Sequence, residues 1–428
     1  MKGVLLLGAG LVSRPFVRAV TAWPDVELTV ADLDPTAAAR VLDGHPRGRA
    51  VAVSVDDDAA LSKLVEGSEL VVSLLPATLH VRIAKQAIAH RVPMITTSYV
   101  SPDMQALDAA AREAGILLLN EIGLDPGLDH MSAMRLIRTV QSEGARVVSF
   151  RSCCGGLPSP EANTNPWGYK FSWSPRGVLA AGRKPARWIA DGRVVEVPGG
   201  EIFRHAAPYD VSEVGRLEVY PNRDSNAYAA TYGIEGVRTM FRGTLRYPGW
   251  CETMDALQRL GLLDDAARTW RAGTTHAEFM ESFAAPGDEP LPAAVMERLR
   301  FAGLFADAPL GPSRMAPIDV LCARLVASLA YAEGERDMIV LRHELGVVAA
   351  SGRGETRTST LVAYGEPRGD SAMARTVALP AAVAARLILD GRIASTGVRI
   401  PVEPAIYEPV LDALEPMGIV FRETQTAP

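Results

Sequence analysis

The sequence has little cysteine and little histidine, and both shortages limit the chemistry it can carry. Its 428 residues include four cysteines, with one adjacent pair and no C-x-x-C motif. Its seven histidines are scattered without the spacing of metal ligands. We therefore expect no structural metal and a reducing compartment, and we place the protein in the cytoplasm.

Long apolar runs are also absent. No segment approaches the roughly 18 unbroken apolar residues that a membrane helix needs. The apolar start, MKGVLLLGAG, is too short for a secretory signal, since Arg14 and Arg18 follow where a hydrophobic region should continue. The sequence thus predicts a soluble chain that is neither exported nor inserted into a membrane.

An excess of positive charge is missing as well. Forty-four lysines and arginines against fifty aspartates and glutamates give a net charge of −6, which argues against nucleic acid or an anionic membrane as the main partner. Any anion-binding site must therefore be built locally. Apolar residues make up 48% and charged residues 22%, as in soluble globular proteins, so what is present is a folded chain long enough for two or three domains.

The first 120 or so residues alternate short apolar runs with helical stretches. This alternation predicts a parallel sheet with helices on both faces, a doubly wound domain. Ser101 can cap a helix that has Pro102 in its first turn and Gly115 past its end. The expected strands are residues 3–8, 26–32, 50–55, 69–76, 93–98 and 116–123.

Beyond Phe150 the regular alternation of strands and helices gives way to irregular sequence, and a second domain begins. Residues 151–177 (RSCCGGLPSPEANTNPWGYKFSWSPRG) read as one long loop, a length that is usually functional. EVYPN, DMIVLRHELGVV and TSTLVAYG predict strands, the last two as antiparallel neighbours joined around SGRGE. Met254, Leu257 and Leu260 recur three apart and predict helices between residues 251 and about 336. The tail AIYEPVLDALEPMGIVF reads as a helix then a strand that returns to the first domain.

A glycine motif follows the first expected strand. Gly8, Gly10 and Ser13 form G-x-G-x-x-S before a helix, where glycines let the backbone approach a pyrophosphate and the helix N-terminus supplies N–H groups. Asp32 ends the second strand, where a carboxylate can bind a ribose 2′-hydroxyl and repel a 2′-phosphate, so it favours NAD over NADP. The alternatives are a glycine turn without a ligand and a solvated turn carboxylate.

Polar residues cluster where other strands of this domain end. Pro76 ends the fourth strand, Ser98 and Tyr99 follow the next one, and Asp125 lies before a helix that begins near Pro126. Ligands bind such sheets at the carboxyl ends of the strands. Asp125 alone is also a plausible helix cap.

Arginines gather on two loops of the second half. YPNRDS carries Arg223, and RGTLRYPGW carries Arg242, Thr244 and Arg246. Arginine flanked by glycine, proline and tyrosine on a loop is suited to forked recognition of a carboxylate. Cys154, in the long loop, is either part of the same site or a small apolar filler.

Taken together, these strings resemble the saccharopine dehydrogenases of the glutamate-forming type, also called saccharopine reductases. The strings are GAGLVSRP, SLLPATLH, SYVSP, NEIGLDPGLDHM, CGGLPSPE, NPWGYKFSWSPRGVL, YPNRDS and RGTLRYPG. The resemblance covers nearly the whole chain and is weakest from about 255 to 335. It implies an α/β fold: a variant Rossmann domain (1–129, with a return at about 402–428), a substrate and dimerisation domain (130–250 and 337–401) and a helical insertion (251–336).

The resemblance also implies an activity and a site. The family oxidises the secondary amine of saccharopine to an imine with NAD(P)+, and hydrolysis gives L-glutamate and 2-aminoadipate 6-semialdehyde; the reverse direction makes saccharopine. The implied substrate contacts are Ser98, Tyr99, Asp125, Arg223, Thr244, Leu245 and Arg246. The implied cofactor contacts are Gly8, Gly10, Leu11, Val12, Asp32, Leu75, Pro76, Ser98 and Ser174. Yeast-type members that use NADPH tend to carry a basic residue where this chain has ADLD, which favours NAD, with NADP as the alternative. A homodimer is expected.

The sequence leaves the proton transfer open. Asp125 and Tyr99 are candidates for the group that keeps the amine unprotonated and activates water, and Cys154 is a third. Two other functions compete: a related dehydrogenase for another secondary-amine conjugate, such as a carboxypolyamine or an opine-like compound, and a cofactor-sensing protein without turnover. A polyamine pocket would need acidic residues, so Arg223 and Arg246 favour a polycarboxylate.

Overall fold

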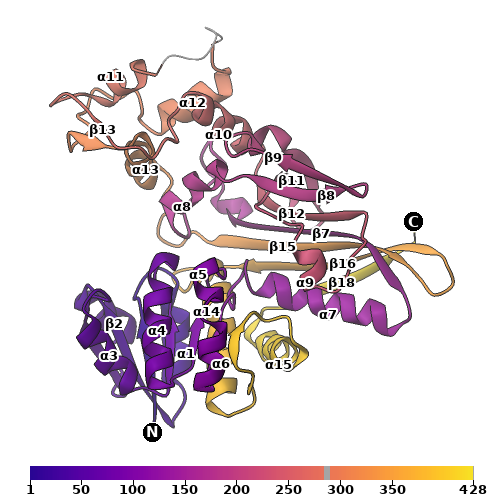
Figure 1. Ribbon diagram of the computed structural model, residues 1–428. Coiled ribbons are helices and arrows are strands. Elements are labelled where there is room, and N and C mark those ends of the chain that lie inside the picture. The colour runs from indigo at the N-terminus through magenta and orange to yellow at the C-terminus, as the bar shows by residue number, and fades with distance from the viewer. Residues whose placement is uncertain (284–289, 428) are drawn as a thin grey trace. The chain divides into compact units, whose positions relative to one another are not determined.

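The structure, a computed structural model, describes residues 1–283 and 290–427 and divides into two compact units (Figure 1). The first unit comprises Met1–Glu143 with Gly369–Arg422, and the second comprises Gly144–Arg368 with residues 423–428. Residues 284–289 of the expected insertion and residue 428 of the expected return lie outside the described residues.

The first unit holds a parallel sheet in the order β17-β6-β5-β4-β1-β2-β3. β1 and β4 are neighbours although two strands separate them in sequence, and this reversal is the switch point where open α/β sheets bind ligands. All six strands expected in this domain are present. The strands are β1 Lys2–Leu7, β2 Val26–Asp32, β3 Gly48–Ala52, β4 Leu70–Ser73, β5 Met94–Thr96, β6 Leu117–Leu119 and β17 Gly397–Arg399.

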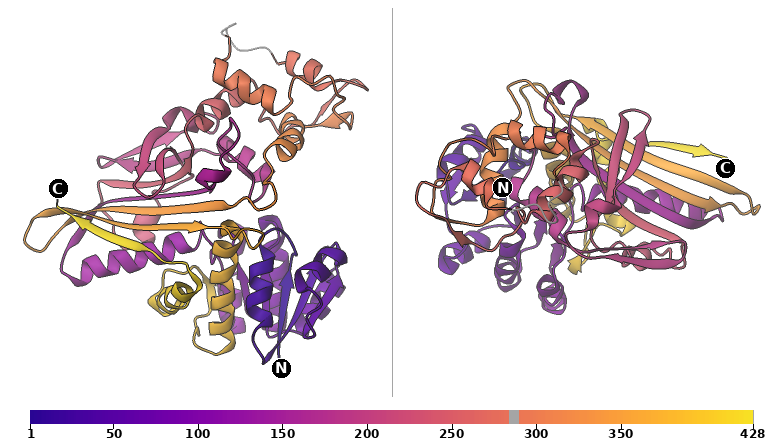
Figure 2. Two further views of the ribbon diagram at one scale, coloured as in Figure 1. Left: turned by 180° about the vertical axis from the view of Figure 1, so that it is seen from behind. Right: turned by 90° about the horizontal axis from the view of Figure 1, so that it is seen from above.

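Helices cover both faces of this sheet, as the alternating pattern predicted (Figures 1 and 2). One group, α1, α2 and α14, packs together, and so does another, α3, α4 and α6. α7 packs against α15. The helices are α1 Ser13–Thr21, α2 Pro35–Leu42, α3 Asp58–Glu66, α4 His80–His90, α5 Pro102–Gln105, α6 Asp108–Ala114, α7 Leu128–Ser142, α14 Ala372–Leu389 and α15 Pro404–Leu414.

The helix expected after Ser101 is divided in two. Ser101 Oγ does accept a hydrogen bond from Met104 N at 3.1 Å, and Gly115 is left-handed past the end, so both end signals are confirmed. Between α5 and α6 the chain turns at Leu107, which packs on the core. Asp108 then begins the second helix and its Oδ1 accepts from Val398 N of β17 at 2.8 Å. A contact with a distant strand thus overrides a continuous helical period.

The strands of the C-terminal tail differ from the prediction, because the strand that extends the first sheet is not the last strand of the chain. The expected helix is present as α15, but the strand that extends the first sheet is β17, which comes before that helix and pairs with β6. The final strand, β18 Arg422–Thr426, lies beside β16 of the second sheet. The chain also returns to the first unit at Gly369, with α14, instead of at residue 402. The three-domain division of the sequence otherwise stays a prediction.

α14 is the one helix, within the residues that the structure describes, that is long and apolar enough to cross a membrane. Of its most apolar window, 67% is buried inside the protein. The core helix of a soluble protein passes the same test, so α14 is weak evidence of a membrane span.

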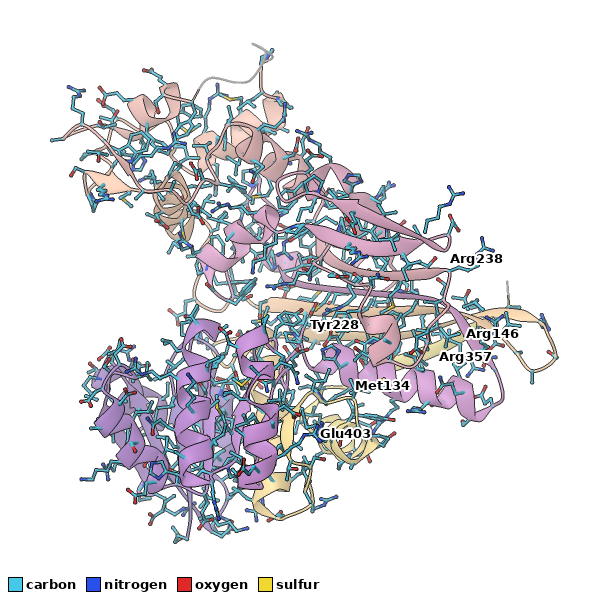
Figure 3. The ribbon with its side chains drawn as sticks, in the orientation of Figure 1. Met134, Arg146, Tyr228, Arg238, Arg357 and Glu403 are labelled. Carbon is cyan, nitrogen blue, oxygen red and sulfur yellow. The ribbon has the colours of Figure 1, made fainter. Side chains whose placement is uncertain are left out.

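The second unit is built on a mixed sheet in the order β10-β11-β12-β7-β15-β16-β18, with β8 and β9 attached through β12. β7 and β12 run parallel, and β15 and β16 form the expected antiparallel pair around SGRGE. Figure 3 shows Arg146 and Arg238 where β7 and β12 begin, at one end of the sheet. The strands are β7 Arg146–Pro158, β8 Ala186–Ala190, β9 Arg193–Val197, β10 Ala207–Val211, β11 Gly215–Pro221, β12 Thr239–Arg246, β15 Asp337–Val348 and β16 Gly354–Tyr364.

The predicted loop 151–177 is wrong in its first eight residues, which belong to β7. β7 lies inside the sheet between β12 and β15. Its Gly155 reads as a loop residue, but a Cβ there would lie 2.7 Å from Leu245 O of β12. The glycine thus permits close approach of two backbones within a strand.

Helices follow the sheet strands where the apolar spacing predicted them. Met254 and Leu257 are completely buried and Leu260 is 8% exposed, all in one core cluster with Trp167, Tyr169 and Trp250. A two-stranded ribbon also lies within this stretch. The helices of the second unit and the two strands of this ribbon are α8 Pro175–Ala180, α9 Tyr228–Thr231, α10 Trp250–Arg259, β13 Arg268–Thr269, α11 His276–Glu281, α12 Ala293–Phe301, β14 Arg314–Met315 and α13 Pro317–Ser328.

Candidate active site

The glycine loop lies between β1 and α1, at the switch point of the first sheet. Gly8 has a φ of 100°, and a Cβ there would lie 3.3 Å from the Leu74 carbonyl carbon. At Gly10 a Cβ would meet no atom within 4 Å, so open space lies above the loop. Ser13 is buried and its Oγ donates to Gly10 O at 2.8 Å. The open glycine loop at the N-terminus of α1 therefore fits a dinucleotide pyrophosphate.

Asp32 lies at the end of β2 and faces this loop. Its Oδ2 accepts from Ala9 N at 2.7 Å, and its Oδ1 accepts from Asp34 N at 3.0 Å. Part of its role is therefore to brace the glycine loop from the second strand. Leu11, in the glycine loop, and Leu33, next to Asp32, are 73% and 76% exposed.

The ends of β4 and β5 meet at a buried histidine that the sequence reading missed. His80 is 3% exposed, its Nδ1 lies 3.0 Å from Ser73 Oγ, and its Nε2 lies 2.9 Å from both Thr96 Oγ1 and Ser98 Oγ. Burial lowers the pKa of His80 to about 4. It is therefore a neutral hydrogen-bonding centre that holds Ser98, and the only signal was its place in SLLPATLH after Pro76.

Tyr99 and Asp125 come together beyond β5 and β6. Tyr99 Oη donates to Asp125 Oδ1 at 2.7 Å. The helix predicted to begin near Pro126 is α7, which begins two residues later at Leu128 with Gly127 as its N-cap residue. Asp125 is therefore not the N-cap, and the carboxylate in the first turn is Asp129, which accepts from Gly127 N at 2.6 Å.

In the second unit, Arg246 ends β12 inside an aromatic cage. The residue is 3% exposed, and its guanidinium carbon lies 5.0 Å from the Tyr169 ring centroid, 5.5 Å from that of Trp250 and 5.9 Å from that of Tyr220. One Nη donates to Leu245 O at 2.7 Å, while Nε has no partner. Within the described ranges no carboxylate pairs with this cation. A buried guanidinium in that state is suited to an anionic ligand.

Cys154 of β7 is paired with Thr244 of β12. Thr244 lies two residues before Arg246 on the same strand. Cys154 is 7% exposed. Leu245 is completely buried in the core of this sheet, so its side chain serves packing. The neighbouring Cys153 is completely buried, and this burial raises the pKa of its thiol to about 12.

The YPNRDS loop is tied to the sheet by its backbone and by Ser225. Asn222 N donates to Arg242 O at 2.9 Å, and Ser225 Oγ accepts from Arg242 N at 2.9 Å. Arg242 stacks on Tyr228, whose ring centroid lies 4.4 Å from the guanidinium carbon. Arg223 has a φ of 52° and an exposed side chain, and its positive charge lowers the pKa of Lys184. The two side chains therefore lie close enough for their charges to repel.

Four further predicted site residues are placed by local structure. Ser174 caps α8, its Oγ accepting from Gly177 N at 3.3 Å; its contact with a cofactor stays a proposal. Leu75 and Pro76 follow β4, and Val12 is the N-cap residue of α1. Among the residues that the structure describes, no group of three or more histidines, cysteines, aspartates or glutamates could hold a metal ion.

Comparisons with known proteins agree along the whole chain. Residues 4–119 match a family model described as the saccharopine dehydrogenase NADP binding domain, and residues 123–419 match the saccharopine dehydrogenase C-terminal domain. The chain is 39% identical to saccharopine dehydrogenase [NADP(+), L-glutamate-forming] of Schizosaccharomyces pombe, covering 99% of each chain. It is 39% identical to the mouse alpha-aminoadipic semialdehyde synthase and spans 48% of that protein's length.

A solved structure also matches the chain over its full length. The apo saccharopine dehydrogenase (L-Glu forming) of Saccharomyces cerevisiae is 38% identical, with a TM-score of 0.88 and full coverage of both chains.

Proposed function

Because the chain belongs to the saccharopine dehydrogenase family, we propose that it interconverts saccharopine with L-glutamate and 2-aminoadipate 6-semialdehyde. The reaction oxidises the C–N bond between the two halves of the substrate. A hydride leaves the carbon beside the secondary nitrogen, the amine loses its proton, and water adds to the resulting imine and releases glutamate. A bound nicotinamide supplies the hydride acceptor.

The observation that carries the substrate class is the buried guanidinium of Arg246. Saccharopine has three carboxylates, and an overall acidic protein must gather cations locally to bind them. Arg246 offers a desolvated N–H donor without a protein acceptor, and the aromatic rings around it exclude water. Arg223, with Lys184 nearby, is proposed to bind a second carboxylate. A polyamine conjugate would meet repulsion at both positions.

The Tyr99–Asp125 pair is proposed to handle the proton. The secondary amine is protonated at neutral pH, so a base must take one proton before hydride can leave. Asp125 Oδ1 already accepts the phenolic hydrogen of Tyr99 at 2.7 Å, which holds both groups in register for accepting that proton and for orienting water. Cys154 is the lesser candidate.

The cofactor is a nicotinamide dinucleotide, held by the glycine loop and the N-terminus of α1. The relatives named above carry NADP(+) in their names, and the matching family model is an NADP binding domain, which favours NADP and leaves the NAD preference expected from Asp32 without support from relatives. What supports NAD in this chain is the Asp32 carboxylate at the ribose position, followed by Leu33 in place of a basic residue. We propose that Asp32 decides the choice and that NAD+ is the better substrate.

Reduced-nicotinamide fluorescence tests the proposed activity. The purified protein is mixed with NAD+ or NADP+ and saccharopine, and in reverse with the reduced cofactor, glutamate and the semialdehyde. We expect turnover in both directions, and none with a carboxypolyamine of similar length. Turnover with the polyamine conjugate and none with saccharopine would show that saccharopine is not the substrate.

A further inference from the structure

The phenol of Tyr99 has to be held accurately, although the residue lies in a loop. β5 ends at Thr96 and α5 begins at Pro102, so no strand or helix fixes residue 99 directly. Displacing a reacting group by about 1 Å can cost about 10²-fold in rate. Something near the loop must therefore restrain the two peptide groups that flank the tyrosine.

Glu121 does this from both sides. Its backbone N donates to Ser98 O at 3.1 Å, and its side-chain Oε1 accepts from Val100 N at 2.9 Å. Ser98 and Val100 are the residues immediately before and after Tyr99. A single residue therefore binds the chain on each side of the tyrosine.

Glu121 is itself held from α7. Its Oε2 lies 2.7 Å from Nε2 of His130, a residue in the first turn of that helix. The Glu121 side chain is 7% exposed and that of His130 is completely buried. Both carboxylate oxygens are thus engaged in the interior, one by the loop that carries Tyr99 and one by the helix that follows Asp125.

The backbone at Glu121 is unusual in a way that serves these contacts. Its φ of 58° lies in the left-handed region that favours glycine. A glycine would relieve the strain but would lose the side-chain bonds to Val100 and His130. Strained non-glycine residues persist where the surroundings over-determine them, and they cluster at functional sites.

We propose that Glu121, anchored by His130, is a positioning residue that aligns Tyr99 with Asp125. The inference rests on the proposed function, since it assigns these two groups to proton transfer. It adds a residue that acts through the tyrosine loop and touches neither substrate nor cofactor.

Two variants at this position separate alignment from simple loss of stability. Glu121→Ala removes the bonds to Val100 and His130, and we expect kcat to fall roughly tenfold or more, with the KM for the dinucleotide unchanged. Glu121→Gln can accept from Val100 N and donate to His130 once the imidazole presents Nε2 as an acceptor, so it should restore most of kcat. Ser101→Ala is the matched control, because it removes a cap from the same loop without touching either flank of Tyr99.

A double-mutant cycle shows whether the effect passes through the tyrosine. In a Tyr99→Phe background, Glu121→Ala should cost much less than in wild type, since the phenol it aligns is already gone. Equal losses in the two backgrounds would overturn the proposal. So would a kcat for Glu121→Ala within about twofold of wild type, against the roughly tenfold loss expected from misalignment, or a loss matched by Ser101→Ala.

A readout without turnover keeps this test separate from the proposed activity. Hydrogen exchange of the Val100 amide should be faster in Glu121→Ala than in wild type and normal in Glu121→Gln. Unchanged exchange in both variants would show that Glu121 does not restrain the loop. If the wild type shows this pattern of protection but never oxidises saccharopine, the proposed function fails while the restraint stands.

Discussion

At the scale of single residues, the site depends on polar groups whose chemistry is set by burial. Arg246 is a buried cation with an unsatisfied N–H, His80 is a histidine kept neutral by its surroundings, and Asp125 is a carboxylate hydrogen-bonded to a phenol. Each makes a prediction that a change of one side chain can test.

Arg246→Lys keeps the charge but removes the planar fork and the stacking on the three rings. We expect the KM for saccharopine to rise roughly tenfold or more, because charge-assisted forked hydrogen bonds are about twice as strong as neutral ones. The KM for the dinucleotide should not change. Steady-state kinetics measure both, and the control is Arg298→Lys, at an arginine whose side chain is 11% exposed and donates to Pro166 O. Normal saccharopine binding by Arg246→Lys would make this arginine structural.

Asp125→Asn should keep the Tyr99 hydrogen bond, because the amide oxygen accepts as the carboxylate does. It cannot take a proton at neutral pH, so kcat should fall by about 10²- to 10⁴-fold while the melting temperature holds. Asp129→Asn is the matched control in the first turn of α7, with near-normal kcat expected. An Asp125→Asn enzyme of nearly full activity would move the proton transfer to Tyr99 and then to Cys154.

Asp32→Asn tests the cofactor choice better than an alanine would. The asparagine still accepts from Ala9 N and so keeps the glycine loop braced, but it lacks the charge that repels a 2′-phosphate. A hydrogen bond to a charged group contributes about 1.5 to 3 kcal/mol, so the ratio of kcat/KM for NAD+ over NADP+ should fall roughly tenfold. A wild type that prefers NADP+ would remove the premise and agree with the relatives' names.

His80 makes the stability of the first unit depend on pH. Its pKa is lowered to about 4 in the folded protein by burial among three hydroxyls, against 6.5 ordinarily. Between these values the unfolded chain binds a proton that the folded chain does not, so stability is complete above the higher value and is lost as pH falls toward the lower. At about pH 5 the loss is about 2 kcal/mol. Calorimetric melting at about pH 7 and about pH 5 should show a difference that His80→Gln reduces; an undiminished difference would assign it to other groups.

At the scale of elements, the parallel sheet was predictable because the signals for each strand and helix lie within a few residues of sequence. Six apolar strands, the Ser101 cap and the left-handed Gly115 follow from nearest-neighbour chemistry. β7 was not predictable in this way, since Gly155 reads as a loop residue until its distance to Leu245 is known. The strand β17 was missed because its pairing with β6 joins residues almost 300 apart, and no local signal carries that.

The same contrast holds within the site. Gly8, Asp32, Tyr99 and Asp125 lie at strand ends and are visible as motif residues. Glu121 and His130 lie in the quoted string NEIGLDPGLDHM, but their role depends on bonds to another loop. Burial of His80 among hydroxyls of two strands is equally invisible along the chain. The sequence does not show which residues that are distant along the chain contact one another in the fold.

Gly155→Ala tests the account of β7. The added Cβ would lie 2.7 Å from Leu245 O and 2.8 Å from Leu245 Cβ, both on the next strand. Overpacking of this kind typically costs about 1 to 3 kcal/mol, and urea denaturation should show that loss. Gly67→Ala, where the nearest atom is 3.5 Å away, is the control and should be close to neutral. Equal stability of the two variants would mean that the glycine serves no packing role.

At the scale of the whole molecule, an acidic chain has to bind a triply carboxylated substrate. The net charge of −6 gives no general attraction for it. We therefore propose that recognition depends on a few placed cations, Arg246 in its cage and Arg223 beside Lys184, and on a dinucleotide loop at the switch point of the parallel sheet. On this proposal, a chain with a net charge of −6 binds an anionic amino acid conjugate through cations placed at the site.

Product identity tests the central claim most directly. Saccharopine can be oxidised on either side of its secondary nitrogen, so turnover alone does not establish which bond is broken. Purified protein, saccharopine and the oxidised dinucleotide are incubated, and the products are measured by mass spectrometry against the reduced cofactor formed. We predict one L-glutamate and one 2-aminoadipate 6-semialdehyde for each reduced dinucleotide. Lysine with 2-oxoglutarate, or no product from saccharopine at all, would contradict the account.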